Sequence, residues 1–254
     1  MLIDTHTHLY VSEFDHDRRD MIQRAQDAGV STFVLPAIDS ETTEAMHTLK
    51  QDYPENIFLM MGLHPTHVGE NLADELWHVR QQLETNTFVA VGEIGMDLYW
   101  DKTYKKEQQE AFAQQIDWAL EFDLPIVIHC REAFDEIFEV LDGVQDPRLR
   151  GVFHCFTGNL QQAEHAINLN MLLGIGGVVT FKNSGLAETV ANISMDHIVL
   201  ETDAPYLAPT PFRGKRNESS YMTFVADKVA TAHQISVSEV SKKTTNNAKK
   251  LFGI

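Results

Sequence analysis

The sequence contains little cysteine and no stretch that could cross a membrane as a helix. Only two cysteines, Cys130 and Cys155, occur among 254 residues, which argues against a disulfide framework and favours a reducing compartment. No apolar run approaches the roughly 18 residues that a transmembrane helix needs. The first residues show neither the basic segment nor the apolar core of a signal peptide. We therefore expect a cytoplasmic protein that makes no contact with a membrane.

Positive charge is also scarce. The chain has 20 Lys and Arg against 37 Asp and Glu, which gives a net charge of −17. A field of this sign repels nucleic acid at long range and so argues against a simple nucleic-acid-binding protein. An enzyme that holds phosphate through divalent cations tolerates this charge, because the ions dominate the charge within the site.

No linker, low-complexity segment or internal repeat interrupts the chain, and apolar runs alternate with amphipathic segments throughout. Eight apolar runs are typical of strands buried on both faces: 2–8, 32–38, 57–64, 88–97, 125–129, 152–156, 171–179 and 198–203. Helical spacing marks the segments between and after them: 14–28, 40–52, 72–84, 105–122, 132–141, 160–169, 184–193, 220–233 and 238–251. We predict an α/β fold, a (β/α)8 TIM barrel, as one domain over residues 1–254. The alternative, a doubly wound open sheet, would carry a glycine-rich phosphate turn after an early strand, and the sequence has none.

Histidines and carboxylates follow most of these predicted strands. His6 and His8 stand two residues apart in an extended run, so their side chains point the same way and could share one metal ion. Other strand ends carry further such residues: His64, Glu93, His129, His154, Glu201 and Asp203. Because the carboxyl ends of the strands form the active-site face of a TIM barrel, we expect these side chains to meet there.

The number and type of these residues predict a metal site. Imidazoles and carboxylates suit Zn²⁺, Mn²⁺ or Mg²⁺, and there are too many of them for one catalytic ion that keeps an open position. We expect two divalent ions with Glu93 as the bridging carboxylate. The predicted metal ligands are His6, His8, Glu93, His129, His154 and Asp203. Glu201 either orients one of these ligands from a layer deeper or is an acid of the barrel interior, and both cysteines are expected to pack behind the wall.

One basic cluster stands out against the acidic background, directly after the last predicted strand. It comprises Arg213, Lys215 and Arg216 and is followed by Asn217. In TIM barrels, loops in this position often hold phosphate, and guanidinium groups match phosphate oxygens in pairs. We expect these four residues, together with Arg131 and His64, to contact the substrate; the alternative for the cluster is a solvated charged turn.

These motifs resemble the TatD family of metal-dependent hydrolases and nucleases. The matching segments are IDTHTHL at 3–9, GLHP at 62–65, VGEIGMD at 91–97, IHCR at 128–131, FHCFTG at 153–158, LETDAPYL at 200–207 and RGKRNE at 213–218. Ser219 and Met96 depart from the pattern, where proline and leucine are more usual. The resemblance implies a TIM barrel in which His6, His8, Glu93 and Asp203 hold one ion and Glu93, His129 and His154 hold the other.

The same resemblance implies a deoxyribonuclease that cleaves phosphodiester bonds, with 3′→5′ exonuclease action on single-stranded DNA. We predict a hydrolase of ester bonds in which a metal-bound hydroxide attacks phosphorus and the catalytic carboxylates are Glu93 and Asp203. The alternative is a carbon–nitrogen or ester hydrolase of the amidohydrolase or lactonase type. The basic cluster favours phosphate, and no feature of the sequence indicates a subunit interface, so a monomer is expected.

Overall fold

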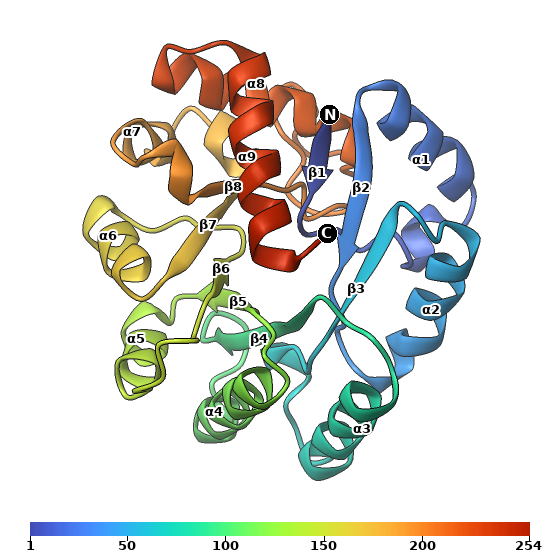
Figure 1. Cartoon of the computed structure of the whole chain (residues 1–254), viewed down its shortest axis with the longest axis vertical. Coiled ribbons are helices and arrows are strands. Elements are labelled where there is room, and N and C mark those ends of the chain that lie inside the picture. The colour runs from blue at the N-terminus through green and yellow to red at the C-terminus, as the bar shows by residue number, and fades with distance from the viewer.

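The computed structural model describes residues 1–254 and shows a barrel of eight parallel strands in chain order (Figure 1). The strands are β1 Leu2–Asp4, β2 Val30–Leu35, β3 Ile57–Met61, β4 Ala90–Asp97, β5 Ile126–Arg131, β6 Gly151–Phe153, β7 Met171–Ile175 and β8 Ile198–Leu200. The predicted (β/α)8 TIM barrel is confirmed.

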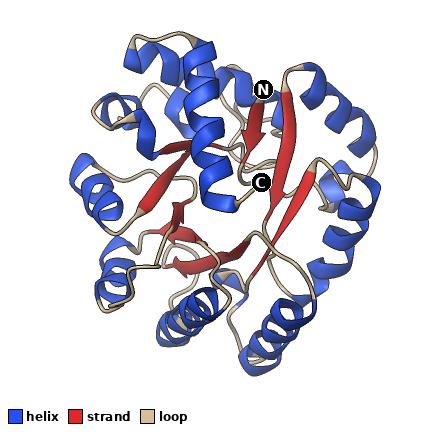
Figure 2. Cartoon of the chain, in the orientation of Figure 1, coloured by secondary structure: helices blue, strands red, loops and turns tan.

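Helices surround the strands as an outer ring, except the last one, which lies across one end of the barrel (Figure 2). They are α1 Arg18–Asp27, α2 Thr43–Asp52, α3 Leu72–Thr85, α4 Lys105–Glu121, α5 Phe134–Asp142, α6 Leu160–Asn168, α7 Leu186–Ala191, α8 Met222–His233 and α9 Val237–Phe252. None of them combines the length and apolarity that a bilayer span requires.

Several strands end earlier than their apolar runs. The predicted runs 2–8, 57–64 and 198–203 contain strands of only three to five residues, β1, β3 and β8. Beyond these points, backbone groups bond to neighbouring loops; for example, the His8 amide donates to the Ala204 carbonyl at 2.8 Å. The predicted ends of these three strands were therefore wrong. Residues 5–8, 62–64 and 201–203 lie in loops at the carboxyl end of the barrel.

The barrel closes between its first and last strands through loop backbone. The Thr5 amide donates to the Leu200 carbonyl at 3.1 Å, and the Asp203 amide donates to the His6 carbonyl at 2.9 Å. The second of these bonds places Asp203 beside His6, although the two residues are 197 positions apart in the sequence.

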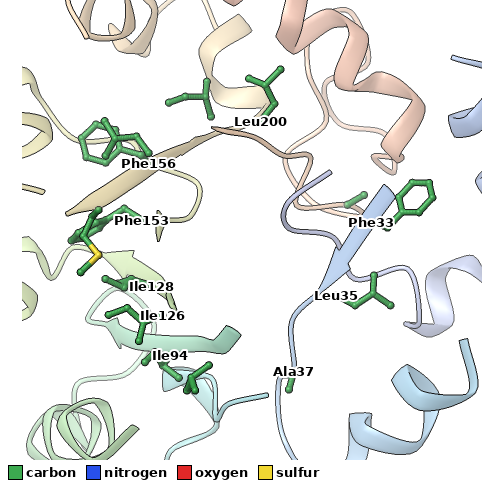
Figure 3. Close-up of a cluster of buried hydrophobic side chains, with 14 of the residues drawn as sticks. Phe33, Leu35, Ala37, Ile94, Ile126, Ile128, Phe153, Phe156 and Leu200 are labelled. Atoms are coloured by element: carbon green, nitrogen blue, oxygen red, sulfur yellow. The ribbon is translucent and has the colours of Figure 1, made fainter. Parts of the chain in front are cut away.

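Two apolar regions stabilise the barrel from either side of its strands. The outer region lies between strands and helices and includes Phe33 and Leu35 of β2, Ile126 and Ile128 of β5, and Phe153 of β6 (Figure 3). Contact on both faces explains why the strands appear in the sequence as nearly continuous apolar runs.

The inner apolar layer fills the amino-terminal end of the barrel. Strand side chains and two residues of α9 pack together there: Ile3, Val34, Met60, Ala90, Val127, Val152, Val199, Ala248 and Phe252. Thr245 and Asn247 of α9 donate hydrogen bonds to the carbonyls of Met1 and Ile198, where β1 and β8 begin. Helix α9 therefore closes this end, with both chain termini beside it (Figure 1). The carboxyl end stays open for a site.

Candidate metal centre

The carboxyl end of the barrel is organised around Glu93, which is 1% exposed. Its Oε2 lies 3.0 Å from Nε2 of His6 and 3.8 Å from Nε2 of His8. Asp203 Oδ1 lies 3.9 Å and 3.5 Å from the same two nitrogens. One half of the site therefore groups His6, His8 and Asp203 closely enough to hold one cation, with Glu93 Oε2 beside them.

The other oxygen of Glu93 faces a second group of imidazoles. Its Oε1 lies 2.7 Å from Nδ1 of His129, 2.8 Å from Nε2 of His154 and 3.4 Å from Nε2 of His64. One carboxylate thus separates two ligand sets, as a bridge between two cations requires. All six predicted metal ligands lie in this cluster.

A β-bulge turns Glu93 toward the barrel axis. Ala90 belongs to the inner apolar layer, so strict alternation along β4 would also place Ile94 inside. Instead, the pairing passes from Val91↔Ile126 to Ile94↔Ile128, so three steps along β4 match two along β5. Ile94 then packs in the outer core, and Glu93 faces the histidines.

The hydrogen bonds of His8 show that a cation fits the first half of the site. Tyr10 donates its hydroxyl proton to the Pro36 carbonyl at 2.7 Å, so its oxygen accepts from His8 Nδ1 at 2.9 Å. Neutral His8 then carries a lone pair on Nε2, which faces the carboxylates of Glu93 and Asp203. A lone pair directed at carboxylate oxygens is repulsive unless a cation lies between them, so this arrangement suits a metal ion.

Asp97 orients His129 in the second half. Asp97 is 1% exposed, and its Oδ2 accepts a hydrogen bond from His129 Nε2 at 2.9 Å. This bond leaves the lone pair of His129 on Nδ1, which faces Glu93. Burial acts to raise the pKa of Asp97, but the hydrogen bond from His129 outweighs it and lowers that pKa. Sequence reasoning missed this role, although Asp97 follows Glu93 by four residues on the same strand and so shares its inward direction.

Glu201 lies directly behind His154. Its Oε1 is 3.3 Å from His154 Nδ1, without the alignment of a hydrogen bond, and accepts the Cys155 amide at 2.5 Å. Gly174 makes room for this carboxylate, since a Cβ at that position would collide with Glu201 Oε2. The structure therefore places Glu201 as a fully buried acid of the barrel interior that contacts the His154 ring without a hydrogen bond to it.

The charges of the cluster depend strongly on one another. Burial raises the pKa of Glu93, but the imidazoles of His154 and His6 outweigh burial and hold it well below its ordinary value. Burial lowers the pKa of His129 and His154, yet their carboxylate neighbours raise both above the ordinary value. A cation that binds here therefore displaces protons from the imidazoles.

His64 presents a donor rather than a lone pair to this cluster. Its Nδ1 accepts the Thr66 amide at 3.1 Å, so the proton of the neutral ring sits on Nε2. Burial lowers the pKa of His64 to about 4, so the ring is neutral at pH 7. An N–H group suits a substrate oxygen better than a metal ion, and the substrate-binding role of His64 stays a prediction.

A cavity of about 680 Å³ opens onto the cluster and is also lined by Trp100, Arg131 and Tyr206. Cys130 and Cys155 line it too, and both are partly exposed. The expectation that they pack behind the wall is confirmed in part: Cys130 packs against the outer apolar region, but both thiols are only half-buried and reach the cavity. Burial raises the pKa of Cys130 to about 12 and that of Cys155 well above its ordinary value, so neither is a thiolate at pH 7.

The predicted basic cluster divides into two parts. Arg213 and Lys215 are exposed and have no carboxylate partner, but neither lines the cavity; Arg213 packs over the Phe181 ring at 4.1 Å. Arg216 instead binds the Asp17 carboxylate with both guanidinium nitrogens, at 2.7 and 2.8 Å.

Asn217 is fully buried outside the cavity and donates to the carbonyls of Thr202 and Tyr206. The expected substrate contacts of Arg216 and Asn217 are therefore corrected: both residues hold the loop after β8 in place.

An eight-stranded parallel barrel with imidazoles and carboxylates around a shared glutamate defines the class of metal-dependent hydrolases. Residues 3–253 match the family described as TatD related DNase. The chain belongs to this TatD family, which confirms the resemblance seen in the motifs.

Three relatives illustrate the family. The uncharacterized metal-dependent hydrolase YabD of Bacillus subtilis is 37% identical over 100% of both chains. The 3′-5′ ssDNA/RNA exonuclease TatD of Pantoea ananatis is 31% identical, again over 100% of both. The crystal structure of the TatD homologue YjjV of Escherichia coli is 32% identical and superposes with a TM-score of 0.94, covering 100% of this chain and 98% of that one. The protein is accordingly a metal-dependent hydrolase.

Proposed function

We propose that the protein hydrolyses phosphodiester bonds in single-stranded DNA or RNA and removes nucleotides from the 3′ end. The observation that carries this proposal is Glu93, whose two oxygens face two separate ligand sets. A relative of full length is named a 3′-5′ ssDNA/RNA exonuclease, which supports the choice of substrate and direction.

The proposed cofactor is a pair of divalent cations, Mg²⁺, Mn²⁺ or Zn²⁺. His6, His8, Asp203 and Oε2 of Glu93 would hold one ion, and His129, His154 and Oε1 of Glu93 the other. When bound, such ions activate water and stabilise the charge that develops on phosphoryl oxygens. One chain supplies every ligand, so a monomer is sufficient.

Asp203 is the proposed base for the attacking water. Its side chain is 13% exposed and lines the cavity, whereas that of Glu93 is 2% exposed. Burial raises the pKa of Asp203, but the imidazoles of His8, His154 and His6 outweigh it and hold that pKa below its ordinary value, so the carboxylate stays ionised and can accept a proton.

The substrate phosphate is held by residues of the cavity wall. His64 would donate its Nε2 proton to a phosphate oxygen, and the exposed guanidinium of Arg131 would neutralise charge on the same group. Arg213 and Lys215 lie outside the cavity, where they would attract the rest of a longer strand. Replacing both with Ala should raise KM and leave kcat unchanged.

The test uses metal-stripped protein and single-stranded oligonucleotides labelled at either end. Mg²⁺, Mn²⁺ and Zn²⁺ are added in turn, to wild type, Asp203→Asn and Asp196→Asn; Asp196 is an exposed carboxylate near the start of β8 and serves as the matched control. We expect cation-dependent loss of the 3′ label first, abolished only in Asp203→Asn. Absence of cleavage with every ion, together with turnover of lactones or cyclic amides, would overturn the proposal in favour of the carbonyl hydrolase.

A further inference from the structure

Two exposed aromatic side chains stand at the mouth of the cavity. Tyr99 and Trp100 follow β4 and are 48% and 69% exposed. Side chains of this size are normally buried for most of their area, and Trp100 also lines the cavity. An aromatic surface left open beside a reaction centre is typical of a ligand contact.

Arg131 completes this surface. Its guanidinium carbon lies 3.8 Å from the centre of the Tyr99 ring and 5.1 Å from that of Trp100. No carboxylate pairs with Arg131, although the chain carries a net charge of −17. The mouth thus combines flat π-faces with a free cation, which are the two features that bind single-stranded nucleic acid without regard to sequence.

Asp97 fixes this surface relative to the metal centre. Its Oδ1 accepts the amides of Tyr99 at 3.0 Å and Trp100 at 3.2 Å, while its Oδ2 accepts from His129. The same carboxylate therefore positions a proposed metal ligand and the aromatic pair, so the distance between them is held by one side chain. A ligand that spans both would meet a preorganised surface.

We propose that a nucleobase next to the scissile phosphate stacks on Trp100, with Arg131 against that same phosphate. This inference rests on the proposed function, because it requires a substrate whose phosphodiester carries a base. The loop after β8 supplies the opposite wall with Tyr206 and Leu207, 47% and 41% exposed, so the cavity is bounded by apolar surface on two sides of the cluster.

In this proposal, substrate affinity has two sources: stacking of the base on Trp100 and charge attraction to the phosphate. The chain as a whole is strongly negative, so beyond the local contacts with Arg131, Arg213 and Lys215 the substrate backbone gains little from electrostatic attraction. Stacking does not depend on charge, so loss of Trp100 should affect substrates with bases and spare those without.

The test compares binding of two phosphorothioate oligonucleotides that resist hydrolysis, one of thymidines and one abasic, in Mg²⁺. Trp100→Ala should weaken binding of the thymidine strand roughly tenfold or more and leave the abasic strand unchanged. Trp100→Phe should recover most of the loss. Trp77→Ala is the matched control, since Trp77 is 67% exposed on α3 and outside the cavity.

Cleavage of ordinary oligonucleotides is measured in parallel. Equal binding of both strands by the wild type, or equal losses in the Trp100 and Trp77 variants, would overturn the stacking inference even if cleavage is normal. A Trp100 effect confined to the thymidine strand, with no cleavage under any cation, would support stacking and overturn the proposed function alone.

Discussion

The two ends of the barrel use the same strands for opposite purposes. On β5, Val127 lies in the inner apolar layer and His129, two residues later, lies in the metal cluster; Val152 and His154 repeat the pattern from β6 onward. The amino-terminal layer is apolar and sealed by α9, whereas the carboxyl end buries imidazoles and carboxylates that depend on hydrogen bonds. Burial of apolar area stabilises the first end, but desolvation of charge makes the second end costly unless cations or partners compensate. One end therefore stabilises the fold, and the other provides the chemistry.

The sharpest test of this division is at Glu93. Glu93→Gln removes the charge that both ligand sets share, so we expect activity to fall by at least about 10³-fold and metal content to fall with it. The fold should persist, because the apolar layer is untouched. Initial rates, elemental analysis and circular dichroism check this; an active variant with full metal content would contradict the bridging role.

The converse change is Phe252→Ala at the apolar end. Phe252 is 5% exposed against the inner layer, so its truncation should lower the free energy of unfolding by about 3 kcal/mol. The kcat at 15 °C should stay within a factor of two of the wild type, since the metal centre lies at the other end. Urea unfolding measures the first value, and a large fall in kcat without a loss of stability would mean that the two ends are not independent.

Asp97→Asn weakens the orientation of one ligand without removing it. The amide cannot accept as strongly from His129 Nε2, so we expect a 10- to 100-fold loss in metal affinity or activity. Metal titration should detect the change in affinity directly. An unchanged affinity would show that the second ligand set needs no support from Asp97.

The smallest expected effect is at the salt bridge between Arg216 and Asp17, which holds the loop after β8 in place. Asp17→Asn should lower the free energy of unfolding by less than about 1 kcal/mol, because the pair is partly exposed. The hydrogen bond from Arg216 lowers the pKa of Asp17 relative to the unfolded chain. This stabilisation is therefore complete above about pH 4 and shrinks as the pH falls further.

Urea unfolding of the wild type and the Asp17→Asn variant at pH 7 and pH 3 checks both points. The difference between the two proteins should be larger at pH 7. A difference that is equal at the two pH values would exclude an ionised Asp17 as its source.

Much of the fold and of the ligand set follows from local patterns. Alternating apolar runs and amphipathic segments predict the barrel, because each pattern records which faces are buried. His6 and His8 stand two residues apart in the loop after β1 and face the same cluster, with their ring centres 5.3 Å apart. Counting by twos from the inner-layer residues Val127, Val152 and Val199 predicts the inward direction of His129, His154 and Asp203, although only His129 lies within its strand.

Other features depend on partners that are distant in the chain. The sequence alone determined the barrel, the gathering of histidines and carboxylates at one end, and the family. Only the tertiary structure decided that a bulge in β4 turns Glu93 inward, that Asp97 accepts a hydrogen bond from His129, and that Arg216 forms a salt bridge with Asp17. The physical reason is that alternation and helical spacing are local properties of the chain. A bulge, a buried hydrogen bond or an ion pair depends instead on which segments the completed barrel brings into contact.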